Sequence, residues 1–183
     1  MEIKMEQYNK DHNKQLGETE KKQISILRSG NSKAIIDTID EIKGRGRASI
    51  LPEIFDLLLI TMDQDVIAAC TTLLNDLKID EASEYIIPAL KDQKYIPVRQ
   101  ILVSSCWQSG IDFHTDYLLF AEIFLSDDYA TAIEAFTVLE NCIGELTDRD
   151  IVQLTGLLES GLKTVPAEKK ALVSELLLVI RSY

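Results

Sequence analysis

Residues that interrupt helices are scarce in this sequence, whose 183 residues include four prolines and eight glycines. The β-branched residues do not gather into the alternating runs that half-buried strands need. Apolar side chains make up 46% of the chain, which is enough for a single domain of this length to bury a core. The composition therefore predicts an all-α protein with long helices and short turns.

Long apolar segments are missing as well. The longest unbroken aliphatic run, Leu176 to Ile180, is too short to span a bilayer. The first 22 residues are too polar to contain the apolar segment of a secretory signal. We therefore expect a cytoplasmic protein that does not enter a membrane. A polar lead-in at 1–18 is expected to precede a single helical domain at 19–183.

Cysteine and histidine are too few, and too scattered, for most catalytic or metal sites. Cys70, Cys106 and Cys142 lack CxxC spacing and sit among apolar residues, which indicates reduced, buried thiols rather than disulfides or a zinc site. The two histidines, His12 and His114, are isolated, which argues against a His-based triad. We expect no cofactor, no metal and no enzymatic activity.

The alternative is an enzyme or small-ligand binder on the same scaffold, with a pocket assembled only by the fold. A deep pocket with buried carboxylates around His114, which lies between Asp112 and Asp116 in the chain, would favour this alternative.

Positive charge is scarce in the middle of the chain. The whole sequence has a net charge of −11, whereas residues 48–160 carry 20 acidic and 5 basic side chains, a net of −15. A surface this negative repels phosphate backbones, which argues against unaided binding to nucleic acid. Part of the acidity has a local cause, because carboxylates that precede helices accept free backbone N–H groups. We assign this capping role to Asp80, Asp116, Asp127 and Asp148, and to the clusters at 63–65 and 126–128.

A pattern of small or apolar residues recurs about every 32 positions. In each copy these residues stand at relative positions 0, 3, 4 and 7, the spacing of one helix face. The four copies begin at residues 35, 66, 98 and 132, so their starts are 31, 32 and 34 residues apart. Two helices of three to four turns with their connecting turns use this length, which predicts a series of stacked helix pairs. The copies are Ile35-Thr38-Ile39-Ile42, Val66-Ala69-Cys70-Leu73, Val98-Ile101-Leu102-Ser105 and Ala132-Ala135-Phe136-Leu139.

The segment "LKDQKYIPVRQILVSSC" (90–106) resembles a HEAT repeat, and the segments at 62–77 and 124–141 resemble degenerate copies of it. The resemblance covers roughly residues 31–160. It implies a right-handed α-α superhelix, a solenoid of about four HEAT-like helix pairs with N- and C-terminal capping helices. An armadillo-like or other helical-pair class remains the alternative.

The sequence departs from the HEAT pattern at its arginine position. Arg99 matches that position, whereas the aligned residues of the other copies are isoleucines, so no continuous ladder of arginines is expected. Arg99 is therefore expected to pair with a turn carboxylate of an adjacent repeat. The candidates are Asp63, Asp65 and Asp128.

The resemblance implies a scaffold or adaptor that binds a protein or peptide on its concave face, which the second helix of each pair would line. Tyr85 and Tyr117, 32 residues apart near the starts of two successive second helices, are candidate aromatic anchors. With Glu84 and Asp116 beside them, they would form an acidic groove for a basic segment. The alternative is that both tyrosines pack between repeats.

The last helix is predicted to begin at Pro166 and carries more apolar residues than one neighbouring helix would cover. Leu178 and Val179 widen its apolar stripe, so we take them as a candidate contact for a homodimer. The alternative is that they are buried against the preceding helix pair.

Overall fold

The computed structural model describes residues 17–44 and 48–183. Within these ranges every regular element is a helix, and the ten α-helices are joined by turns and short 3₁₀ helices. The α-helices are α2 (Glu18–Leu27), α3 (Ser32–Lys43), α4 (Leu51–Ile60), α5 (Gln64–Asn75), α6 (Ser83–Lys91), α7 (Arg99–Ser109), α8 (Tyr117–Ser126), α9 (Tyr129–Cys142), α10 (Asp148–Gly161) and α11 (Ala167–Arg181). The 3₁₀ helices are η1 (Ala48–Ile50), η2 (Asp80–Ala82), η3 (Gln93–Val98), η4 (His114–Asp116) and η5 (Ile143–Glu145).

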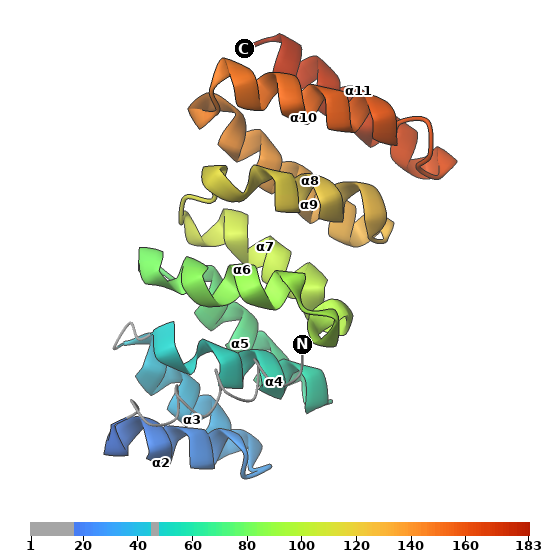
Figure 1. The fold of residues 1–183 in the computed structure, drawn as a ribbon. Helices are drawn as coiled ribbons and strands as arrows, with labels where there is room; N and C mark the ends of the chain where they lie inside the picture. The colour runs from blue at the N-terminus through green and yellow to red at the C-terminus, as the bar shows by residue number, and fades with distance from the viewer. Residues whose placement is uncertain (1–16, 45–47) are drawn as a thin grey trace, which may run out of the picture.

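The helices are stacked in chain order, with the N-terminal pair at one end and the C-terminal pair at the other (Figure 1). Helices α3, α5, α7, α9 and α11 contact one another in succession and form one layer. Helices α2, α4 and α6 pack in the same order in the second layer, and α8 packs on α10. The prediction of an all-α chain of stacked helices is confirmed. None of the helices in the described ranges has the length and apolarity needed to cross a bilayer.

The predicted apolar stripes lie on α3, α5, α7 and α9, the helices of the first layer. Every stripe residue is buried or half-buried and belongs to, or packs against, one continuous core. The second layer contributes the largest buried side chains of this core, including Phe55 on α4 and both Phe120 and Phe124 on α8. The 3.6-residue period therefore identified the buried face of each first-layer helix.

The helix ends are close to their predicted places. Helix α11 begins at Ala167, one residue after the predicted start at Pro166, which is the N-cap residue of this helix. Gly110 ends α7 with a φ of +73°, the left-handed conformation that glycine adopts without strain. Most of the predicted lead-in, residues 1–16, and with it His12, lies outside the described residues.

Of the aspartates assigned to helix caps, Asp63 is confirmed, Asp127 and Asp148 are each one residue from the observed cap, and Asp80 and Asp116 form no cap. Asp63 accepts the N–H groups of Asp65 and Val66 at the start of α5. Asp128 accepts the N–H of Thr131 at the start of α9, so the cap is not Asp127 as predicted. At α10 the cap is Thr147 instead of Asp148. The side chains of Asp80 and Asp116 make no N-terminal capping bond to η2 and α8, respectively.

Pro52 and Pro88 occupy different positions in their helices. Pro52 is the second residue of α4, where its missing N–H matters least. Pro88 lies inside α6, because this helix begins at Ser83. Pro88 is exposed, so water can reach the carbonyl that its missing N–H leaves without a donor.

Arg99 pairs with Asp127 in the turn between α8 and α9. Its Nη1 lies 3.1 Å from Oδ1 and 2.9 Å from Oδ2 of that carboxylate. Arg99 was correctly predicted to pair with a turn carboxylate of an adjacent repeat. The partner is none of the three carboxylates named as candidates. The next residue, Asp128, was among them, but its carboxylate caps α9.

A buried lysine fastens α11 to the same turn. Lys169 is only 2% exposed, and its Nζ donates to the carbonyl oxygens of Leu125 at 2.9 Å and Asp127 at 2.8 Å. These carbonyls lie at the C-terminal end of α8, where the helix dipole favours a cation. Burial lowers the pKa of this amine.

Candidate interaction site at the ends of α7 and α9

The predicted groove residues do not form the exposed aromatic pair expected of them. Tyr117 is buried at the start of α8, and its hydroxyl lies 3.1 Å from Asp150 Oδ1 and 3.2 Å from Gln153 Oε1, both on α10. Burial, followed by the hydrogen bond to Asp150, raises the pKa of this phenol. Tyr85 is half-buried on α6 against the core, and beside it Glu84 is exposed. Tyr117 therefore packs between helices and is not an exposed anchor.

The two candidate dimer residues lie in different surroundings. Leu178 is 59% exposed on α11, whereas Val179 is half-buried and packs against the core. Only Leu178 therefore offers an apolar surface to a partner.

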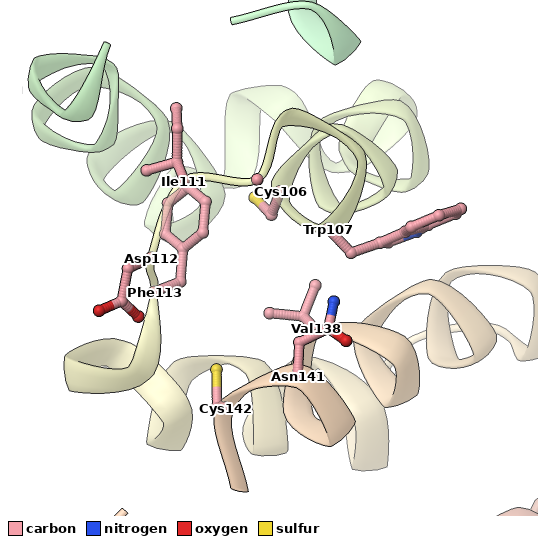
Figure 2. Close-up of a pocket in the computed structure, with 9 residues that line it drawn as sticks. Cys106, Trp107, Ile111, Asp112, Phe113, Val138, Asn141 and Cys142 are labelled. Atoms are coloured by element: carbon pink, nitrogen blue, oxygen red, sulfur yellow. The ribbon is translucent and has the colours of Figure 1, made fainter. Parts of the chain in front are cut away.

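A cleft of about 220 Å³ opens between the C-terminal ends of α7 and α9. It forms because Gly110 turns the chain away from α7 into the segment 111–113, whose apolar side chains form one wall. Figure 2 shows Val138, Asn141 and Cys142 pointing from α9 toward the segment that carries Cys106. Mainly apolar side chains line the cleft, and these residues are Cys106, Trp107, Gly110, Ile111, Asp112, Phe113, Val138, Asn141 and Cys142.

The two thiols of the cleft are poorly suited to nucleophilic chemistry. Burial, aided by the nearby charges of Asp112 and Asp116, raises the pKa of Cys142 to about 12. Burial also raises the pKa of Cys106. A reactive cysteine needs a low pKa, which a neighbouring cation or a helix N-terminus supplies. Here the thiols lie near carboxylates and at helix C-termini, which act in the opposite direction.

His114 does not lie in a deep pocket with buried carboxylates. Its Nδ1 is 2.6 Å from Asp112 Oδ2, and both side chains are substantially exposed. The pKa of Asp112 is lowered, first by the backbone N–H of His114. Across the described ranges no group of three or more His, Cys, Asp or Glu side chains is arranged to hold a metal ion. This histidine therefore belongs to a solvent-facing turn.

Trp107 is the most distinctive side chain of the cleft. It is 37% exposed, and its Nε1 donates to Glu134 Oε2 on α9 at 2.7 Å. Sequence reasoning did not name Trp107 among the candidate site residues. The signal was available, because Trp107 is nine residues after Val98, which is about 180° around the helix from that stripe residue.

The exposed face of α7 itself is poor in charge. The exposed residues of α7 are Gln100, Trp107 and Gln108, and its one charged residue, Arg99, is bound to Asp127. The cores of protein interfaces are similarly depleted in charge and enriched in aromatic residues. The large apolar residues exposed on η3, α7 and α9 are Ile96, Trp107, Tyr129 and Ile133.

A wider hollow of about 310 Å³ lies between α2, α4 and η3, but its charged side chains already satisfy one another. Arg28 binds both carboxylate oxygens of Glu53, and Asp56 accepts hydrogen bonds from Lys94 and Tyr95. These pairs hold neighbouring helices together, and no aromatic residue lines the hollow. The cleft between α7 and α9 is therefore the stronger candidate site.

A search against models of known protein families finds no match to this chain, and a search of curated proteins finds no relative.

Proposed function

We propose that this protein is a non-catalytic interaction module, a scaffold or adaptor that binds another protein. We further propose that its helix pairs form a right-handed HEAT-like superhelix. The alternating two-layer packing and the regular spacing of the stripes support this architecture. Three buried cysteines without a disulfide fit a reducing compartment such as the cytoplasm.

The observation that carries the proposed function is the exposure of Trp107 on α7, whose other exposed residues are uncharged, next to a cleft with mainly apolar walls. Tryptophan and tyrosine dominate the binding energy of protein interfaces, where they fill pockets near the centre of the contact. A cleft of about 220 Å³ is smaller than the roughly 300–1,000 Å³ of typical small-molecule sites, so it suits one side chain of a partner. The binding face is thus proposed to be the surface of α7 and α9 rather than the face with Tyr85.

A comparative pull-down from native lysate tests this proposal. We expect a Trp107→Ala/Ile133→Ser double variant to lose a partner that wild type retains, with partner recovery lower by about tenfold or more. Tyr85→Ala on α6 is the control variant and should retain that partner. The opposite pattern would assign binding to the face with Tyr85. Equal recovery of all proteins by the three forms would overturn the proposal.

A second candidate function is self-association through the end of the stack formed by α10 and α11. Val152 is 72% exposed on α10, and Leu178 is exposed on α11. The pair Glu159–Arg181 joins these two helices on the same side, because Glu159 follows Val152 by two turns and Arg181 follows Leu178 by one. The other end of the stack is polar: its exposed residues on α2 and α3 are Glu18, Thr19, Lys21, Lys22, Ser25, Lys33, Asp37, Asp40, Glu41 and Lys43. This asymmetry favours a symmetric dimer over a head-to-tail chain.

A further inference from the structure

The rim of the cleft between α7 and α9 is acidic. Asp112 lines the cleft, and Asp116 lies close enough to both thiols for its charge to raise their pKa values. Glu134 stands at the opposite side, where it accepts the hydrogen bond of Trp107. Among the described residues, no cation forms an ion pair with Asp116 or Glu134, and Asp112 binds His114 alone, through its ring Nδ1 and its backbone N–H.

One lysine lies near this rim, and its amine is already engaged. Lys78 Nζ donates to the carbonyl oxygen of Ser109 at 2.9 Å, at the C-terminal end of α7. Among the described residues it forms no ion pair within 4 Å. One carboxylate of the lining, Asp112, and two nearby carboxylates, Asp116 and Glu134, therefore stand against one lysine. The electrostatic potential of the rim favours a cationic ligand.

The walls of the cleft favour an apolar side chain, whereas the rim favours positive charge. Buried side chains of Ile111, Phe113 and Val138 form much of the wall, with Asn141 and Asp112 as the polar residues of the lining, so a polar group that entered would exchange most of its hydrogen bonds to water for contact with apolar atoms. An apolar side chain would exchange water contact for contact with these walls and with the ring of Trp107. An acidic rim around mainly apolar walls is therefore complementary to an apolar side chain with basic neighbours.

We infer that the cleft between α7 and α9 binds a basic segment of a partner protein, with an apolar side chain inserted beside Trp107 and flanking Lys or Arg residues at Asp112, Asp116 and Glu134. The inference rests on the proposed interaction function and names the chemistry of the partner. In this arrangement the inserted apolar side chain supplies most of the affinity, and the carboxylates determine selectivity and the rate of association.

Trp107 makes this inference directly measurable, because it is the only tryptophan of the chain. Its fluorescence reports on this cleft alone when the probes lack tryptophan and tyrosine. The probes are short synthetic peptides with a central leucine flanked by lysines, by glutamates or by serines. A fourth peptide keeps the lysines and replaces the leucine with glycine.

We expect the lysine-flanked leucine peptide to change the Trp107 emission saturably and to bind at least tenfold more tightly than the glutamate-flanked and glycine peptides. High salt should weaken its binding, because the rim is exposed to solvent. An Asp112→Asn/Asp116→Asn double variant should lose about threefold to tenfold in affinity. Asparagine at 112 keeps the side-chain oxygen that accepts the N–H of His114, so the turn is preserved.

The matched control is Asp37→Asn/Asp40→Asn on α3, which removes the same charge from exposed positions on another helix. This variant should bind the peptide with wild-type affinity, and circular dichroism should show that both double variants are folded. Equal losses in the two variants would mean that net charge acts without a rim site, which would overturn the inference.

The remaining outcomes separate this inference from the proposed function. Equal binding of lysine-, serine- and glutamate-flanked peptides would overturn the basic partner and keep the apolar anchor. No saturable change with any peptide would overturn the inference as a whole. The proposed interaction function would then still stand if the Trp107→Ala/Ile133→Ser variant lost its partner in the pull-down, and it would fail if that variant retained every partner.

Discussion

The carboxylate of Asp127 accepts a hydrogen bond from Arg99, and its backbone carbonyl accepts one from Lys169. This single turn residue therefore joins α7 to α11. Both side chains of the pair Arg99–Asp127 are largely buried, with exposures of 13% and 14%. Such a pair is costly to break, because removal of one partner leaves the other charge without compensation.

We expect a double-mutant cycle with Arg99→Met and Asp127→Asn to give a coupling energy of about 1–3 kcal/mol. The pair Lys43–Asp76, at 2.5 Å but 41% and 46% exposed, is the control and should give about 0.5 kcal/mol or less. Urea denaturation monitored by circular dichroism measures both values. Similar coupling energies for the two pairs would contradict the structural role assigned to Asp127.

Lys169 should contribute to stability, whereas its neighbour Lys170 should not. Lys169→Met removes the donor to two carbonyls and is expected to lower the free energy of unfolding by about 1–3 kcal/mol. Lys170 is exposed, and Lys170→Met should change this value by about 0.5 kcal/mol or less. If methionine were tolerated equally at both positions, the two hydrogen bonds of Lys169 would be energetically unimportant.

The three cysteines should react slowly in the folded protein. Burial raises the pKa values of Cys70 and Cys142 to about 12 and raises that of Cys106, so little thiolate exists near pH 8. A thiol-specific reagent should therefore label the native protein slowly and label three thiols rapidly in denaturant. Rapid labelling of Cys106 or Cys142 under native conditions would show that the cleft opens or holds a reactive thiolate.

The cap of α9 should make stability depend on pH. The pKa of Asp128 lies below its ordinary value of 3.8, first because its carboxylate accepts the N–H of Thr131. A carboxyl with a lower pKa in the folded state stabilises the fold above the unfolded pKa, and this contribution is lost as the pH falls through the folded pKa.

Asp128→Ala should therefore lower stability by about 1 kcal/mol at neutral pH. The difference from wild type should persist down to about pH 4.5 and diminish at lower pH. Thermal unfolding across this pH range measures it, with Asp37→Asn on the exposed side of α3 as a control. A difference that grew upon acidification would have the wrong sign.

Leu178 and Val152 provide the test of self-association. If α10 and α11 form a symmetric contact, Leu178→Glu or Val152→Glu should shift a concentration-dependent dimer toward monomer by at least tenfold in the dissociation constant. Light scattering at several concentrations measures the equilibrium. A wild-type protein that stays monomeric throughout would remove this candidate function.

Much of the fold was predictable because helix periodicity is a local property. The stripe from Ile35 to Ile42 identifies the buried face of α3 without knowledge of its neighbours, and the same holds for α5, α7 and α9. The roles of Asp127 and Asp128 were not predictable to the residue. The two carboxylates are adjacent, and only the positions of Arg99 and Thr131 in space decide which of them pairs and which caps.

The candidate site was less accessible to sequence reasoning. Its walls come from residues 106–113 and 138–142, which are separated by more than one helix and meet only because α7 packs on α9. The face of Trp107 could be obtained from periodicity, but the cleft beside it and its bond to Glu134 depend on tertiary packing. The predicted anchor Tyr117 failed for the same reason, because its proximity to α10 has no local signature.

Arg99 and Lys169 bind the same turn, so removal of the last helix should weaken the helices before it. A chain cut before α11 would keep α8 but lose the amine that occupies the last carbonyls of that helix. Arg99 of α7 would then bind a turn from which Lys169, the second of its two cations, had been removed. The helices from α7 to α11 are therefore expected to unfold as one cooperative unit, and a shortened chain should keep α11 to its end at Arg181.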